Sequence, residues 1–193
     1  IANNLAYLQP SATMTVNKKS GKERIFIVGM PRSGSTLLET ILSMNPEIKD
    51  LGESSSLKVA ITKFHEQEAY NSIYQNLNEI YSQIEPINNA QVKYTTEKNL
   101  YNFVCISFIA FHMPAAKIIH CRRNPMDNIL SMHRSNLTSG NSYTANIEDA
   151  AKVLIAQEKA MQIQKNRHPE KIFTFNYDQF VNEPEANQRK IRG

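Results

Sequence analysis

The chain has 193 residues, of which 41% are hydrophobic and 21% are charged, and its formal net charge is +4. This length suits one domain with a sizeable core. Six glycines and eight prolines are too few for a collagen-like or low-complexity chain, and recurring apolar blocks exclude full disorder. No apolar run approaches the roughly 18–20 residues of a membrane-spanning helix. The longest apolar cluster, 102–113, is interrupted by Ser107 and His112.

Two cysteines, Cys105 and Cys121, both lie in apolar runs. Two cysteines cannot build a disulfide framework, so we expect buried free thiols in a reducing compartment, and hence a cytoplasmic protein. The first residue is Ile1 rather than Met, so we expect the natural N-terminus to lie outside this sequence.

In chain order, residues 1–24 are predicted to be a lead-in or linker, or the end of a preceding helical region. Short apolar segments then alternate with segments of helical periodicity. The predicted strands are 25–28, 92–96, 117–121 and 172–175. The first predicted helix begins after the turn 30–34 and ends before Pro46. Four further helices are predicted over 57–84, 100–112, 125–134 and 146–166. Pro125 is expected at a helix start and Asn146 as an N-cap. The polar stretch 135–144 is predicted to be a mobile loop.

The first strand, 25–28, is entirely apolar and β-branched or aromatic, which is typical of a central strand buried on both faces. Strands that alternate with helices predict an α/β fold, a three-layer P-loop-type sandwich with a central, mostly parallel sheet. Ligands of such folds bind at the carboxyl ends of the strands. Two polar segments, 29–36 and 122–125, follow strands and are therefore expected to meet there.

The segment Gly29–Thr36 lies between a strand and a helix and matches the phosphate-loop pattern G-x-x-x-x-G-x-[ST]. Ser35 occupies the position of the usual lysine. Backbone N–H groups of the loop and the helix N-terminus can still hold an anion, and Arg32 adds a guanidinium. Without the lysine, metal-dependent transfer of a γ-phosphoryl group is disfavoured. A plain strand–helix turn and a nucleotide kinase with a degenerate loop remain the alternatives.

A basic cluster lies between residues 114 and 135, where four cations accompany a single acidic residue, Asp127. The cations are Lys117, Arg122, Arg123 and Arg134. Such a cluster fits either a solvated face or a small polyanionic ligand. The five histidines show no metal-ligand spacing, no Ser-His-Asp order is present, and basic residues are not interleaved with aromatics. We therefore expect no metal, no hydrolase site and no nucleic-acid partner.

Two segments resemble the nucleotide-binding motifs of sulfotransferases. Met30–Leu38 (MPRSGSTLL) resembles their 5′-phosphosulfate loop, and Ile118–Asp127 (IIHCRRNPMD) resembles their 3′-phosphate motif. Weaker matches are Gly52-Glu53, Glu97–Leu100 and Phe175–Pro184. Their order is most similar to bacterial sulfotransferase domains often fused to tetratricopeptide repeats, and is also similar to tyrosylprotein sulfotransferases. The resemblance implies a sulfotransferase domain over 25–193 that is truncated before the basic C-terminal loop of the family.

The resemblance further implies in-line transfer of a sulfuryl group from 3′-phosphoadenosine 5′-phosphosulfate (PAPS) to an acceptor hydroxyl, with adenosine 3′,5′-bisphosphate (PAP) as product and no metal. The acceptor could be a protein, a glycan or a small molecule. The implied catalytic residues are Glu53 as general base, Arg32 and Lys98. The implied nucleotide-binding residues are Arg32, Ser33, Gly34, Ser35, Thr36, Arg123, Ser131 and Tyr177.

Simpler interpretations of single residues stay open. Glu53 could be a helix N-terminal glutamate, Lys98 a solvated lysine, and Tyr177 a core residue. Arg122 and Arg123 are adjacent on a strand, so their side chains are expected to point in different directions. An inactive nucleotide-binding scaffold is the non-enzymatic alternative.

Overall fold

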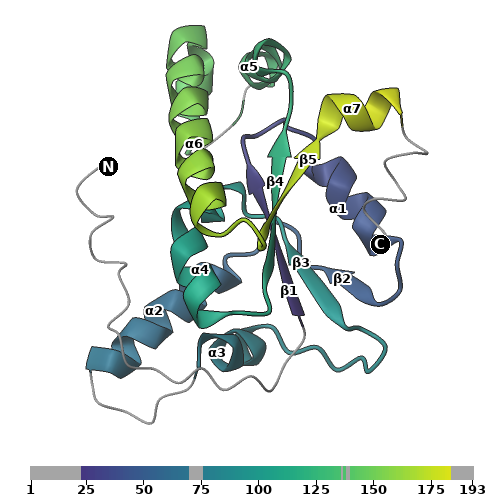
Figure 1. Cartoon of the computed structure of the whole chain (residues 1–193), viewed down its shortest axis with the longest axis vertical. Helices are drawn as coiled ribbons and strands as arrows, with labels where there is room; N and C mark the ends of the chain where they lie inside the picture. Colours follow the sequence, from purple (N-terminus) through teal and green to yellow (C-terminus); the bar gives the residue numbers. More distant parts are fainter. Residues whose placement is uncertain (1–22, 70–75, 136, 138–139, 184–193) are drawn as a thin grey trace.

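The computed structural model describes residues 23–69, 76–135, 137 and 140–183, and its centre is a five-stranded sheet (Figure 1). The strands are β1 (Glu23–Gly29), β2 (Ile48–Asp50), β3 (Tyr94–Glu97), β4 (Lys117–Arg122) and β5 (Ile172–Asn176). Their order across the sheet is β2-β3-β1-β4-β5, and every neighbouring pair is parallel. The predicted α/β fold with a central, mostly parallel sheet is confirmed.

Helices cover both faces of this sheet. They are α1 (Ser35–Ser43), α2 (Ser56–Ala69), α3 (Leu77–Ile84), α4 (Ile106–His112), α5 (Pro125–Arg134), α6 (Ile147–Arg167) and α7 (Tyr177–Asn182), with the 3₁₀ helices η2 (Leu100–Cys105) and η3 (Ser142–Ala145). In Figure 1, α1 and α7 lie on one side of the sheet, and α2, α3, α4 and α6 lie on the other. The molecule therefore has three layers.

The apolar run 25–28 within β1 follows from the central place of this strand in the sheet. Ile27 packs in the cluster formed with α1 and α7, whereas Phe26 and Val28 pack in the cluster on the opposite face. All three side chains are fully buried. A strand covered on both faces can be apolar at every position, which is why no alternation of polar residues appears there.

The predicted helix starts at α5 and α6 are confirmed. Pro125 is the first residue of α5, and the side chain of Asn124 accepts hydrogen bonds from the amides of Met126 and Asp127. Asn146 caps α6 in the same way. These caps satisfy amides that have no partner inside the helix, which is why they can be read from sequence.

Other predicted elements needed correction. The helix predicted over 57–84 consists of α2 and α3, with 70–75 outside the described residues, and the helix predicted over 100–112 begins as the 3₁₀ helix η2. The stretch predicted as a loop over 135–144 contains most of η3. The sequence reasoning missed β2 and α7, which have three and six residues, because such short segments show too few repeats of an apolar pattern. Of the predicted lead-in over 1–24, residues 1–22 lie outside the described residues, and Glu23 and Arg24 belong to β1.

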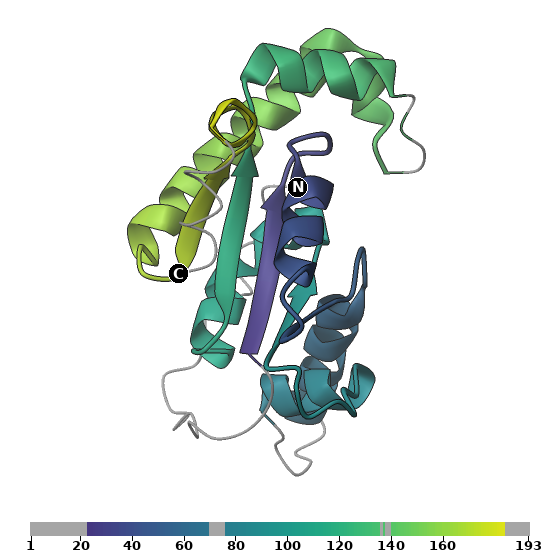
Figure 2. The ribbon, with the colours of Figure 1, turned by 90° about the vertical axis from the view of Figure 1, so that its right-hand side faces the viewer.

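The direction in which strands are added to the sheet reverses between β1 and β4. From β1 the chain passes to β2 and β3 on one side, and then crosses to β4 and β5 on the other. Parallel sheets bind ligands at such a switch point, at the carboxyl ends of the strands. Figure 2 shows β1 and β4 ending at the same edge of the sheet, below α5. The segments 29–36 and 122–125 leave the sheet at that edge.

Two further observations concern membrane-spanning helices and the two cysteines. In the part of the chain that the structure describes, no helix has both the length and the apolar composition to cross a bilayer. Both cysteines are free, Cys121 is buried, and burial raises the pKa of each thiol.

Gly29→Ala is expected to destabilise the protein more than Gly52→Ala. Both glycines have positive φ, +150° and +61°, so each substitution strains the backbone. A Cβ on Gly29 would lie only 2.6 Å from the Cys121 carbonyl oxygen, whereas nothing lies within 4 Å at Gly52. We expect losses of about 3–5 and about 1–2 kcal/mol, respectively, in the free energy of unfolding measured by urea denaturation. Equal losses of unfolding free energy in the two variants would show that β1 and β4 can move apart at Gly29 without a cost in stability.

Candidate functional site

The loop Gly29–Thr36 connects β1 to α1 and is shaped by two residues with left-handed backbone. Gly34 has φ 93° and precedes α1, whose first turn has no side-chain cap. Arg32 has φ 67°, which for a non-glycine residue costs about 1–3 kcal/mol. The side-chain amide of Asn128, on α5, donates to the Pro31 carbonyl at 2.7 Å. Contacts from outside the loop therefore hold a strained turn with open helix amides, an arrangement suited to an anion.

The loop hydroxyls differ in their surroundings. Ser33 is only 1% exposed, and its Oγ is a buried polar atom without a hydrogen-bond partner among the described residues. Ser35 is buried, whereas Thr36 is exposed and its Oγ1 accepts a hydrogen bond from Lys98 at 3.3 Å. A buried hydroxyl without a partner is costly, so Ser33 is poised to donate to a group that enters the loop.

Arg123 follows β4 directly and has donors to spare. Its guanidinium lies 4.8 Å from the centre of the Tyr177 ring, and its Nη1 donates to the Arg32 carbonyl at 3.3 Å. Its Nε is buried and has no hydrogen-bond partner among the described residues. Arg122, by contrast, points to α6 and forms an ion pair with Glu158 at 2.9 Å. The expectation that the two arginines point in different directions is confirmed.

Ser131 lies on α5 and contacts the loop. Its Oγ accepts a hydrogen bond from Arg32 Nε at 3.2 Å. An arginine can only donate, so the hydroxyl hydrogen of Ser131 remains available to another acceptor. Arg32 thus touches Ser131 through its side chain and Arg123 through its carbonyl, which joins the two predicted anion-binding segments.

Tyr177 begins α7 and packs against the same loop. A Cβ on Gly34 would lie 2.3 Å from Cδ2 of Tyr177, so the ring sits directly against the glycine. The Arg123 guanidinium lies over the same ring, 4.8 Å from its centre. Tyr177 thus packs against residues of the predicted nucleotide site, and its contact with the nucleotide stays a prediction.

Lys98 and Glu53 lie together at the carboxyl ends of β3 and β2. Lys98 is 8% exposed, and its Nζ is 3.2 Å from Glu53 Oε1 and 4.0 Å from Glu39 Oε2. The Lys98 amide donates to the Gly52 carbonyl at 2.7 Å, which holds the two segments together. Lys98 is thus not a solvated lysine. The side chain of Glu53 is 77% exposed, so its second oxygen faces solvent.

Two buried carboxylates near this pair, Glu39 and Glu97, were given no role by the sequence reasoning. Glu39 on α1 accepts a hydrogen bond from Thr96 Oγ1 at 3.1 Å, and burial raises its pKa. The available signal was its position among Leu38, Ile41 and Leu42, where a charged side chain is unexpected on a helix face that is otherwise buried.

The second buried carboxylate is Glu97, which is 1% exposed. It accepts hydrogen bonds from the Tyr81 hydroxyl at 2.5 Å, from Asn102 Nδ2 at 2.7 Å and from the Leu57 amide at 3.2 Å. Burial raises the pKa of Glu97, although these donors oppose the shift. The Leu57 amide lies in the first turn of α2, so Glu97 anchors the segment that follows Glu53.

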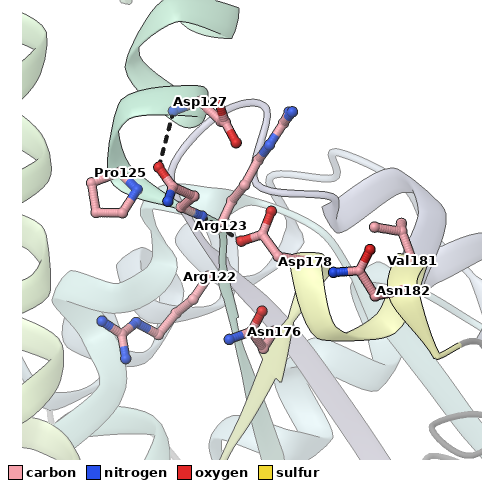
Figure 3. Close-up of a pocket in the computed structure, with 9 residues that line it drawn as sticks. Arg122, Arg123, Pro125, Asp127, Asn176, Asp178, Val181 and Asn182 are labelled. Atoms are coloured by element: carbon pink, nitrogen blue, oxygen red, sulfur yellow. Dashed lines mark hydrogen bonds between the residues drawn. The ribbon is translucent and has the colours of Figure 1, made fainter.

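A pocket of about 580 Å³ lies next to Arg123, between the ends of β4 and β5 (Figure 3). Its lining residues are Arg122, Arg123, Asn124, Pro125, Asp127, Asn176, Asp178, Val181 and Asn182. Within the residues described, no group of three or more His, Cys, Asp or Glu side chains could hold a metal ion. The site consists instead of cations, hydroxyls and backbone amides around an open edge of the sheet.

Comparison with known proteins identifies the class. Residues 24–192 match the sulfotransferase family, and the chain belongs to it. A curated relative, an uncharacterized protein of Aquifex aeolicus, is 23% identical in an alignment of 194 positions that covers 88% of this chain. The chain spans only 25% of that relative's length.

Solved structures share the fold. A sulfotransferase from Alicyclobacillus acidocaldarius has a TM-score of 0.57 and 19% identity, over 89% of this chain and 79% of that one. The sulfotransferase domain of the Synechococcus PCC 7002 olefin synthase has a TM-score of 0.54 and 16% identity, over 91% and 74%. A mouse sulfotransferase complexed with PAP has a TM-score of 0.55 and 14% identity, over 90% and 58%.

Tyr81→Phe is expected to destabilise the protein by about 1–3 kcal/mol, because Glu97 loses a donor while the ring remains over Arg24. Burial already raises the pKa of Glu97 in the folded protein. As the pH rises above the ordinary pKa of a glutamate, the folded state therefore becomes less stable, because the charged carboxylate is disfavoured in its buried position. Loss of the hydroxyl raises that pKa further. The difference between variant and wild type should therefore grow from pH 5 to pH 8 in urea denaturation. A difference that is independent of pH would contradict this account.

Proposed function

We propose that this domain transfers a sulfuryl group from PAPS to an acceptor hydroxyl and releases PAP. The observation that carries the proposal is the state of Arg123, a cation beside the loop with no carboxylate within ion-pair distance among the described residues and with a buried donor left over. A second anion site next to a phosphate-type loop is what a nucleotide with both 5′ and 3′ anionic groups requires. The mouse relative complexed with PAP supports the same ligand.

In this mechanism the loop binds the 5′ end of the nucleotide. The open amides at the start of α1, the Ser33 hydroxyl and the side chains of Ser35 and Thr36 surround the phosphosulfate, and Arg32 neutralises the transferring group. At the other end Arg123 and Ser131 bind the 3′-phosphate, and Tyr177 supports the Arg123 guanidinium. The neighbouring pocket provides room for the rest of the nucleoside.

The chemical step uses the pair Glu53 and Lys98. Glu53 takes the proton from the acceptor hydroxyl, whose oxygen attacks the sulfur while the bond from sulfur to the 5′-phosphate oxygen breaks. Lys98 is 3.3 Å from Thr36 Oγ1, so it is placed to stabilise the negative charge that develops on that leaving oxygen. Among the described residues, fixed cations and backbone amides thus stabilise the transferring group and the leaving oxygen. The exposed side of Glu53 leaves access for the acceptor.

Two alternatives make different predictions. A nucleotide kinase with a degenerate loop would bind Mg²⁺–ATP in preference to PAP, although Ser35 stands where its lysine would be. An inactive scaffold would bind PAP and transfer nothing. Isothermal titration with both nucleotides, followed by transfer assays with tyrosine peptides, oligosaccharides and small alcohols, separates the three.

Arg123→Ala is expected to lower the affinity of the intact protein for PAP by about 10- to 100-fold, because a charge-assisted contact is lost. The affinity for adenosine 5′-monophosphate, which has no 3′-phosphate, should scarcely change. Arg122→Ala is the matched control, because Arg122 is already paired with Glu158. Its effect should be small and equal for both nucleotides in isothermal titration. Equal losses for both nucleotides in Arg123→Ala would withdraw the 3′-phosphate assignment.

Glu53→Gln is expected to reduce the rate of sulfuryl transfer by about 100- to 10,000-fold while leaving PAP affinity unchanged, because the amide cannot accept the proton. Glu47→Gln is the matched control, since it breaks an exposed glutamate–lysine pair with Lys93 away from the site. The measurement is single-turnover transfer from PAPS to the acceptor found above. A Glu53→Gln variant with wild-type rates would remove this residue from the mechanism.

A further inference from the structure

Asp178 follows Tyr177 at the junction of β5 and α7, and it contacts the main chain next to Arg123. Its Oδ2 accepts a hydrogen bond from the Asn124 amide at 2.5 Å. Asn124 lies between Arg123 and Pro125 and caps α5 with its own side chain. Figure 3 shows Asp178 reaching from α7 toward this turn. One carboxylate therefore fixes the peptide that joins Arg123 to the start of α5.

Asp178 lies close to a cation with which it forms no ion pair. Asp178 lines the same pocket as Arg123, yet within the described part of the chain it forms no ion pair with that or any other cation. A carboxylate beside an anion site lowers the affinity for the anion by repulsion. Its recorded contact is the charge-assisted bond to the Asn124 amide, which is stronger than a bond between neutral groups. The contact thus points to a role in holding the backbone.

The side chain of Arg123 has few other restraints. Its Nη1 makes one long hydrogen bond of 3.3 Å, and its buried Nε has no partner in the described residues. Its position consequently depends on the Tyr177 ring beneath the guanidinium and on the backbone that Asp178 holds. Two consecutive residues, Tyr177 and Asp178, thereby restrain the side chain and the main chain of Arg123 from the same junction.

We propose that Asp178 is a positioning residue that sets Arg123 for recognition of the nucleotide 3′-phosphate. This inference rests on the proposed function, because it requires that Arg123 bind that phosphate. Asp178 itself touches no ligand in this role. Its effect is on the discrimination between nucleotides with and without a 3′-phosphate, which is the quantity that a small misplacement of the guanidinium changes most.

The test measures PAP and adenosine 5′-monophosphate binding by isothermal titration with the intact protein, together with melting temperatures. Asp178→Ala is expected to weaken PAP binding by about 10-fold and monophosphate binding much less. Asp178→Asn keeps an oxygen acceptor and removes the charge, so PAP affinity should equal or exceed that of the wild type. Asp178→Glu keeps the charge and displaces the acceptor by one methylene, so PAP affinity should fall. Asp127→Asn, which removes a charge from the same pocket, is the control.

The outcomes are separable. If wild type shows no preference for PAP over the monophosphate, the proposed function fails, and this inference fails with it. If wild type shows the preference and Asp178→Ala and Asp178→Glu keep it, Asp178 does not position Arg123 and the proposed function stands. If both Asp178→Ala and Asp178→Asn strengthen PAP binding as Asp127→Asn does, Asp178 acts only by repulsion and the inference is overturned. Should Asp178→Ala not fold, Asp178→Asn and Asp178→Glu decide between the same outcomes.

Discussion

The contact of the Tyr177 ring with Gly34 and Arg123 is the constraint on which the site depends. The ring occupies the space that a side chain at position 34 would need, and its other neighbour is the Arg123 guanidinium. This contact joins the ends of β1, β4 and β5, which are adjacent in the sheet but distant in the sequence. The loop 29–36 and Arg123 are thereby held at a fixed distance from each other, as a ligand with two anionic groups would require.

The distribution of charges at this edge explains which residues are available for a ligand. Arg24 is buried and bonded to Thr95 and Ser82, and Arg122 is paired with Glu158, so both serve the fold. Arg32 and Arg123 have no carboxylate partner among the described residues, and Arg123 donates to the Arg32 carbonyl. The whole chain has 22 lysines and arginines and 18 aspartates and glutamates, so its net charge does not indicate this local excess of positive charge. The interaction between two charges depends on the distance between them, and not on the total charge of the chain.

The sheet divides the site into two halves with different supports. The ends of β1, β4 and β5 carry the residues assigned to the nucleotide. The ends of β2 and β3 carry Glu53 and Lys98, and the buried carboxylate of Glu97 anchors the segment that follows Glu53. Thr36 connects the halves through its hydrogen bond with Lys98. Lys98 therefore contacts both the loop, through Thr36, and the carboxylate of Glu53.

The amino-acid sequence by itself determined the α/β class, the loop 29–36, the buried strand β1 and the capped starts of α5 and α6. These features follow from short-range patterns, namely apolar periodicity, glycine spacing and cap residues, which act over a few neighbouring positions. The tertiary structure alone decided that Arg122 turns to Glu158 while Arg123 turns to Tyr177, and that Asp178 holds the Asn124 amide. It also formed β2, whose mixed sequence has no strand pattern and which exists because β3 offers a free edge. Such contacts join residues far apart in the chain, so their partners are set only when the sheet brings the strand ends together.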